Sequence, residues 1–455
     1  MPQRAKGTAL REGKTLRRNM RPTNDGAAAA TIARPIATTG EVFADGSVID
    51  VIGGVQGGNP RLMLWNGPKE IVGSLVEHDG RLYEPAPINS SVLQELSLPT
   101  RCRPHGSTRE FLAETCKLVA NFVGLEEKSV ALVGRIVLCS SLIDAVSVAP
   151  ALIIIGPDTA RANRLVALLR CLCRHALPLT GVTPAGLCSL PSGARFTYLI
   201  SQTSISEKLQ LLLGHASNRD RRIPSRGRLL DLFGVQVIHS DSVLAGESWP
   251  HRSIQISMIP TGRELPNFDL DTQHQIMSEF QPKLLSFRRA NLGAACKLQF
   301  NAPQFSFALH DLIHSFAAAT PDDPELQSEL FDLLQEHDAE IRSETWIELS
   351  CVVLEAILVA GRESPGGVIY VADLAEIAQE ILRRRGERTA EIDPGVLGKR
   401  LKVLGFPTEP RDAQGKKLRV TDAVLNRARL LTRKFGGPEV GDDGPVNSSQ
   451  QKKEV

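Results

Sequence analysis

The chain has 455 residues, of which 42% are apolar and 23% charged, and its formal net charge is +2. This length and composition allow two or three domains with real cores and exclude a disordered or fibrous protein. Eight scattered cysteines exclude a small secreted disulfide scaffold. The longest apolar runs, 142–155 and 347–360, contain acidic residues and fall short of the ~20 residues that a membrane span needs. We expect a cytoplasmic protein with reduced thiols and no membrane partner.

The N-terminal residues 1–45 are predicted to form a disordered basic arm, because they lack hydrophobic periodicity. Seven Lys and Arg residues against one acidic residue fall within 1–21, and no apolar run of a signal peptide follows them. Residues 46–100 are predicted to be a small β-rich lead-in. Within it, Asp79-Gly80 between alternating residues is typical of a hairpin turn.

Residues 101–290 are predicted to form a helical lead-in followed by an α/β core. Ser107 and Glu110 have the spacing of a capping box at the start of a helix. The apolar run 152–155 is typical of a strand buried on both faces, and it runs into a turn and an amphipathic helix. Further strand-like runs at 196–200, 234–239 and 253–259 favour an α/β sheet flanked by helices. A helical segment, 291–366, follows.

The junction after the first core strand is where a phosphate-binding loop, G-x-x-x-x-G-K-[ST], would lie. The eight candidate nucleotide-binding positions of this degenerate loop are Gly156, Pro157, Asp158, Thr159, Ala160, Arg161, Ala162 and Asn163. The second glycine, the lysine and the hydroxyl that holds magnesium are therefore replaced by Arg161, Ala162 and Asn163. Arg161 lies one residue early, which is ~100° of rotation on a helix, so it does not replace the lysine.

Asp158 adds a second obstacle, because its carboxylate occupies the electropositive helix N-terminus that a phosphate would use and is placed to cap the helix. The other half of an ATPase site, an acidic pair after a neighbouring strand, is also missing. Ser201 and Gln202 stand there as a degenerate Walker B pair. Glutamine cannot act as the base for an attacking water, and serine is a poor magnesium ligand. These replacements predict a site that does not hydrolyse ATP.

The C-terminal residues 367–436 are predicted to form a winged helix-turn-helix domain, ahead of a disordered tail, 437–455. Their order is helix, helix, β-ribbon, helix, with Asp393-Pro394 starting the second helix. Residues 381–436 hold fifteen Lys or Arg against six Asp or Glu, an excess that favours phosphate binding. The candidate DNA-binding residues are Lys399, Arg400, Lys402, Arg411, Lys416, Lys417 and Arg419. The alternative is a winged helix that contacts protein and has a solvated basic face.

Two other patterns have the spacing of metal ligands. His310 and His314 are four residues apart, and Cys171 and Cys173 form a C-x-C pair. Neither has the further ligands that a zinc site needs, so we expect no metal and no cofactor.

From about 100 to 435 the chain resembles the helicase-like P-loop ATPase domains of the AAA and RecA type found with primases in phages and mobile elements, followed by a winged helix. The pieces that carry the resemblance are "LIIIGPDTARANRLVALL", "FTYLISQ", "HRSIQISMI", "EFQPKLLSFR" and "DPGVLGKRLKVLGF…KKLRV". The resemblance implies that Arg252 lies where such domains carry an arginine that acts on a neighbouring subunit's nucleotide. The departures lie at the catalytic positions, so the resemblance implies the fold and not the activity.

The sequence therefore favours a non-enzymatic DNA-binding or scaffolding protein built on an inactivated helicase-like domain. Its expected partners are double-stranded DNA and, secondarily, other proteins or further copies of itself. Two alternatives stay open: an ATP-dependent motor with an aberrant loop, and a protein-binding adaptor without DNA contact.

Overall fold

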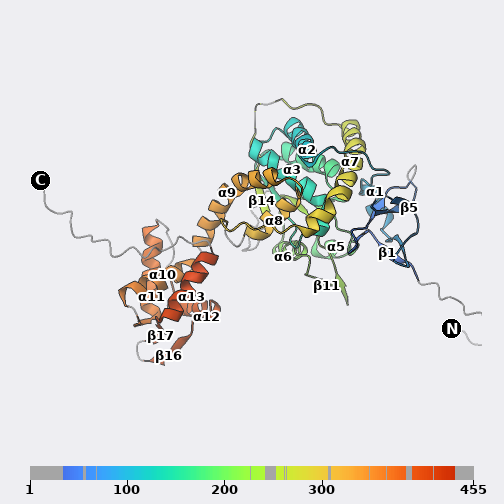
Figure 1. Ribbon diagram of the computed structural model, residues 1–455. Coiled ribbons are helices and arrows are strands. Elements are labelled where there is room, and N and C mark those ends of the chain that lie inside the picture. Colours follow the sequence, from blue (N-terminus) through green and yellow to red (C-terminus); the bar gives the residue numbers. More distant parts are fainter. Residues whose placement is uncertain are drawn as a thin grey trace, which may run out of the picture.

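The computed structural model describes residues 34–54, 58–67, 69–225, 227–240, 253–260, 262, 264–305, 309–347, 349–364, 366–385, 392–412 and 415–435. Side chains are described for these residues except 340–347, 411 and 412. Figure 1 shows a larger N-terminal part, a smaller C-terminal part, and a long helix running between them.

The N-terminal part begins with two small sheets. The strands are β1 (Ile36–Thr38), β2 (Gly40–Val42), β3 (Val48–Ile52), β4 (Arg61–Asn66), β5 (Lys69–Gly73), β6 (Val76–His78) and β7 (Arg81–Pro85), and the short helix α1 (Ser90–Glu95) follows. Strands β2–β5 form an antiparallel sheet, and β1, β7 and β6 form the other. The hairpin turn at Asp79-Gly80 is confirmed, since both residues have positive φ.

The prediction of disorder up to residue 45 is wrong for 36–42, which form β1 and β2. The error has a physical cause: β1 pairs with β7, more than forty residues away, and no local pattern encodes such a pairing. Residues 1–33 lie outside the described part of the chain.

Two helices, α2 (Thr108–Val123) and α3 (Glu127–Ser141), precede the main sheet. The capping box is present in full: the Ser107 hydroxyl accepts from the Glu110 backbone N–H, and the Glu110 carboxylate accepts from the Ser107 N–H. Helix α2 ends at Gly124, which takes the left-handed conformation (φ 68°) that glycine adopts without strain. A 3₁₀ turn, η2 (Ile143–Ala145), leads to the sheet.

The main sheet is parallel and five-stranded, in the order β14-β8-β13-β10-β9. Its elements are β8 (Ala151–Ile155), α4 (Thr159–Leu172), β9 (Ala176–Thr180), α5 (Pro184–Leu187), β10 (Thr197–Ser201), α6 (Glu207–Ala216), β13 (Gln236–His239) and β14 (Ser253–Ser257). A hairpin, β11 (Ile223–Ser225) and β12 (Arg228–Leu230), lies between α6 and β13 in the chain and projects outward near α6 in Figure 1. The predicted α/β sheet flanked by helices is thereby confirmed.

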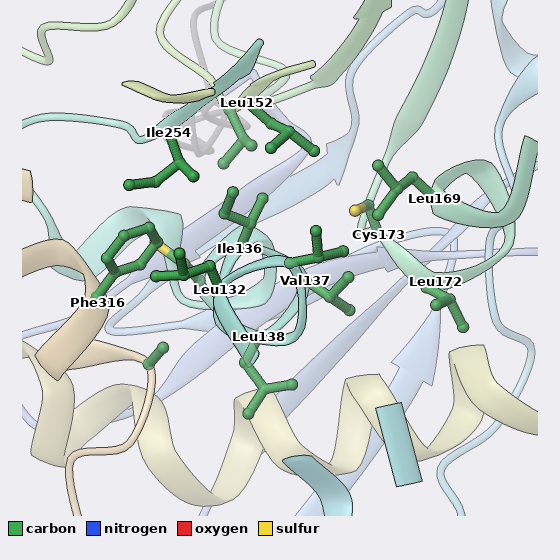
Figure 2. Packing of buried hydrophobic residues seen from close by; sticks show 14 of the residues in the cluster. Leu132, Ile136, Val137, Leu138, Leu152, Leu169, Leu172, Cys173, Ile254 and Phe316 are labelled. Carbon is green, nitrogen blue, oxygen red and sulfur yellow. The ribbon is translucent and has the colours of Figure 1, made fainter. Parts of the chain in front are cut away.

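Alternate residues of β8 face two different cores, as expected for a strand that is covered on both sides. Leu152 and Ile154 pack with α2, α3, α4 and the following helices, whereas Ala151 and Ile153 pack with the α5 and α6 side. Figure 2 shows the first of these cores, where Leu152 and Ile254 lie above Ile136 of α3. Helices α7 (Leu270–Lys297), α8 (His310–Ala318) and the first half of α9 (Pro324–Ile347) complete it.

The C-terminal part has its own core. Its elements are α10 (Leu349–Glu363), β15 (Val368–Tyr370), α11 (Val371–Arg384), α12 (Pro394–Val403), β16 (Thr408–Asp412), β17 (Gly415–Arg419) and α13 (Asp422–Lys434). Strands β15, β17 and β16 form a three-stranded antiparallel sheet. The sequence placed the start of this domain at 367, but α10 belongs to its core. Because ten of the fifteen α10 residues are buried, this helix needs cover on most of its circumference, and α11 and α13 supply it.

Candidate functional site

The junction between β8 and α4 is too short to form a phosphate-binding loop. Strand β8 ends at Ile155 and α4 begins at Thr159, so only Gly156, Pro157 and Asp158 lie between them. Thr159 to Asn163, the last five of the eight candidate positions, are already helical. A chain that turns into its helix this early has no loop of backbone N–H groups to wrap around phosphates.

Hydrogen bonds to the end of β14 also occupy this short turn. Gly156 has φ 118°, and a Cβ there would come within 2.5 Å of the Met258 carbonyl oxygen, so only glycine fits. The Asp158 N–H donates to that same carbonyl at 3.2 Å, and Pro157 has no N–H to offer. Two of the three turn residues therefore present no N–H to an anion.

Asp158 caps α4, as the sequence predicts. Its Oδ1 accepts from the Arg161 backbone N–H at 3.1 Å, and its side chain is only 16% exposed. A partly buried carboxylate thus sits where the helix dipole would attract a phosphate, and the dipole stabilises it there.

The Arg161 guanidinium donates to backbone carbonyls of the chain and is not free for a ligand. Its Nε donates to the Val123 carbonyl at 3.1 Å, its Nη2 to the Gly124 carbonyl at 3.0 Å, and its Nη1 to the Ile259 carbonyl. The first two carbonyls belong to the end of α2, where helix carbonyls lack intrahelical partners. Arg161 therefore ties α2 and the segment just after β14 to α4, and it has few donors left for phosphate.

The second predicted half-site lies at the carboxyl ends of β10 and β13. Ser201 Oγ lies 3.0 Å from Nδ1 of the buried His239 and 3.4 Å from Oδ1 of the exposed Asn163. Strand β13 separates β10 from β8, so the two predicted half-sites are not on adjacent strands, yet Asn163 and Ser201 still meet. His239 was missed by the sequence reasoning, although its place at the end of "GVQVIH" was a usable signal.

Gln202 is held in place by backbone groups. Its Oε1 accepts from the Val182 N–H at 2.8 Å and its Nε2 donates to the Ser204 carbonyl at 2.9 Å. The described residues that end or follow β10 and β13, namely Ser201, Gln202, His239 and Ser240, include no carboxylate. Within the described part of the chain, the ends of these two strands therefore present neither the acidic ligand nor the base of an ATPase. Arg252, the candidate for action across a subunit boundary, lies outside the described residues.

Metal and thiol chemistry find little support in the described part of the chain. No group of three His, Cys, Asp or Glu side chains there is placed to hold a metal ion. His314 Nε2 lies 3.4 Å from the Leu298 carbonyl. Burial raises the pKa of Cys173 to about 12 and that of Cys171 to about 11, so both thiols stay protonated at neutral pH.

A buried network of charges, which the sequence did not reveal, joins the β2–β5 sheet to the core. Asp50 on β3 accepts from Arg174 Nη2 at 2.7 Å and from Arg288 Nε at 2.8 Å, and Arg288 Nη2 reaches Asp144 at 2.7 Å. Burial opposes ionisation of Asp50, but the charges of Arg288 and Arg174 outweigh it and lower the pKa of this carboxyl. The network is structural, because carboxylates balance its cations.

The candidate DNA-binding residues of α12 lie on one side of a helix whose other side is buried through Leu397 and Leu401. Lys399 and Lys402 are exposed and Arg400 is half-buried. No acidic partner for these three side chains occurs among the residues described. Free cations on an exposed helix face are available to bind phosphate.

The β16–β17 hairpin is different. Glu409 accepts from Arg419 Nε at 2.9 Å and lies 3.8 Å from Lys417 Nζ, so one carboxylate brings these two candidates together. Lys416 is exposed and has no acidic partner in the described segments. The side chain of Arg411 lies outside the described residues, although its backbone belongs to β16.

No family model and no curated protein matches the chain. It is similar to a solved apo structure of the NrS-1 C-terminal region, with 12% identity over 82% of this chain and 96% of that chain and a TM-score of 0.35. A full-length MCM homolog from Methanopyrus kandleri matches at 10% identity over 64% of this chain and 77% of that chain, with a TM-score of 0.31. Drosophila ORC bound to DNA matches at 12% identity over 78% and 96% of the two chains, with a TM-score of 0.18.

All three TM-scores are below 0.5, so these similarities carry no conclusion about the function of this chain. None of the described helices combines the length and the apolar character that crossing a bilayer requires.

Proposed function

We propose that this protein is a non-enzymatic DNA-binding protein, in which an inactivated helicase-like P-loop domain carries a C-terminal winged helix. The parallel sheet, with β8 inside it and α4 directly after it, supports the P-loop part of this proposal. The helices α11, α12 and α13 and the β16–β17 hairpin support the winged-helix part.

The case against ATP hydrolysis rests on the number of missing interactions. The lysine, the magnesium hydroxyl, the acidic ligand and the base are all replaced. A charge-assisted hydrogen bond contributes roughly 1.5–3 kcal/mol, and loss of one transition-state donor typically lowers a rate by about 10²–10³. The Arg161 contacts remove the remaining cation of the junction from use.

The case for duplex DNA rests on α12. In helix-turn-helix proteins the second helix enters the major groove, and cations beside it bind the backbone. The exposed side of α12 combines Lys399 and Lys402 with Val396 and Val403, which are 50% and 77% exposed. This free cationic helix face is the observation that carries the proposal.

The test is titration of fluorescent duplex DNA with the full chain at several salt concentrations. We expect the triple variant Lys399→Ala, Arg400→Ala, Lys402→Ala to bind more weakly and to lower the salt slope by about 0.9 per lost phosphate contact. The matched control removes three exposed lysines of the larger part, Lys117, Lys208 and Lys297. Equal losses in the two variants would contradict specific use of α12.

Two other results would favour the alternatives, the ATP-dependent motor and the protein-binding adaptor. Micromolar binding and hydrolysis of ATP with magnesium would favour the motor. The lack of any salt-dependent duplex affinity would favour the protein-binding adaptor. Affinity that survives removal of the whole C-terminal core, 349–455, would place the DNA contact outside α12.

A further inference from the structure

A groove of about 600 Å³ lies where β4, the segment before α2, and α7 meet, and it shares no lining residue with the β8–α4 junction or with α12. The side chains that give it chemistry are Trp65, Cys102, Arg103, His105, Ser286 and Arg289. Its volume is in the range of small-molecule sites. None of its nine lining residues is acidic, so it suits an anionic ligand.

One wall of the groove is a rigid flat surface. The Arg289 guanidinium lies over the Trp65 ring, 4.8 Å from the ring centroid, and its Nη1 donates to Glu70 at 2.9 Å. Trp65 and Glu70 are cross-strand partners, so both fix the same guanidinium plane. The Arg289 side chain remains 29% exposed. A fixed guanidinium plane is a surface on which a heteroaromatic ring stacks.

His105 supplies a second aromatic surface. Its ring packs edge-on against Phe111 at 5.8 Å and Phe287 at 5.6 Å, which fixes its orientation. Burial lowers the pKa of His105, so the ring is neutral at pH 7 and offers a hydrogen-bonding nitrogen without a charge.

Arg103 is the uncompensated cation of the groove. Its backbone N–H donates to the Pro282 carbonyl at 3.1 Å, but its half-buried guanidinium has no partner among the described residues. Because Glu70 balances Arg289, the groove carries about one net positive charge. One such charge matches a single phosphate group, whereas a triphosphate would need further cations or a metal.

We infer that this groove binds a free nucleoside monophosphate, with the phosphate on Arg103 and the base against Arg289. The Arg289 plane complements a flat ring, and the Arg103 charge complements one phosphate. The inference concerns a different part of the molecule from α12, so it stands or falls independently of duplex DNA binding.

Calorimetric titration of the full chain with AMP, adenosine and ribose 5-phosphate separates the contribution of the base from that of the phosphate. Adenosine lacks the phosphate, and ribose 5-phosphate lacks the base. We expect AMP to bind, and each half-molecule to bind at least about tenfold more weakly. Equal binding of AMP and adenosine would remove the role of the phosphate and overturn the inference. So would the lack of AMP binding at millimolar concentration.

Arg103→Gln is the sharpest variant, and Arg101→Gln is its matched control, because Arg101 is exposed two residues away and does not line the groove. We expect Arg103→Gln to weaken AMP binding about tenfold or more, the effect of one lost charge-assisted hydrogen bond. Arg101→Gln should leave it unchanged. Equal effects of the two variants would contradict the inference.

The reactivity of Cys102 shows where AMP binds in the unsubstituted protein. AMP should slow alkylation of Cys102, which lines the groove, and leave the exposed Cys296 on α7 unaffected. AMP bound at the β8–α4 junction would protect neither cysteine. Protection by a single-stranded oligonucleotide but not by AMP would replace the proposed ligand with nucleic acid and overturn the inference.

Discussion

Three arginines of the larger part and the lysines on α12 of the C-terminal part differ in what they bind. In the larger part, Arg161 binds three backbone carbonyls, and Arg174 and Arg288 share the buried Asp50. In the C-terminal part, Lys399 and Lys402 face solvent from α12. An arginine whose donors are already satisfied stabilises the fold but has little left for a ligand. The cation beside the β8–α4 turn is therefore structural, whereas the cations of α12 remain available.

The largest expected effect comes from removing the shared carboxylate. Asp50→Asn leaves Arg174 and Arg288 buried beside a neutral group, and breaking a buried pair in this way costs about 3–5 kcal/mol. We expect the larger part to melt about 10 °C lower in calorimetry. The control Glu77→Gln removes an exposed carboxylate of β6 and should shift the melting temperature little. A similar melting temperature for both variants would show that the network contributes no stability.

A pH effect of about 2 kcal/mol should come from His175. Burial and the charge of Arg174 lower the pKa of His175 to about 3, whereas the unfolded chain has the ordinary value of about 6.5. The unfolded state therefore takes up a proton first, and stability falls as the pH drops from 7 to 5. His175→Asn should flatten this dependence, because asparagine tolerates the positive φ of 47° and does not titrate. Denaturant unfolding at pH 7 and pH 5 gives the free energy of unfolding of both proteins. If this free energy falls as much in His175→Asn as in the wild type, His175 is not the cause of the pH dependence.

The sequence predicts those features that depend on neighbouring residues. The strand character of 152–155, the capping box at Ser107 and the capping role of Asp158 follow from short spacings, and the structure confirms them. Residue types alone also show that residues 161–163 differ from those that a phosphate-binding loop needs.

The features that could not be predicted from the sequence depend on contacts between segments that are distant along the chain. The carbonyl partners of Arg161 lie 37 to 98 residues away, and Asp50 meets Arg288 across 238 residues. The same holds for the pairing of β1 with β7 and for the place of α10 in the C-terminal core. Hydrophobic periodicity reports which face of an element is buried but not what it is buried against.

Free and paired cations of the C-terminal part can be compared directly. The double variant Lys399→Ala, Lys402→Ala should lower duplex affinity about tenfold, because both side chains are available to phosphates. Lys417→Ala with Arg419→Ala should lower it about two- to threefold, because Glu409 already holds both cations. Fluorescence anisotropy at low salt measures both. A larger loss from the second pair would place the DNA contact on the hairpin, and Glu409→Gln would then raise the affinity.

The smallest effect concerns Asp158. Asp158→Ala removes the cap of α4 and should cost about 1 kcal/mol, as should Ser206→Ala at the N-cap of α6, which serves as the control. We expect neither variant to bind ATP in calorimetry. The Asp158 carboxylate is only one of the obstacles: the turn stays three residues long, and Arg161 stays bound to the end of α2. If Asp158→Ala alone gained ATP binding, charge repulsion by Asp158 would be the whole obstacle to ATP at this turn, and neither the length of the turn nor the Arg161 contacts would prevent binding.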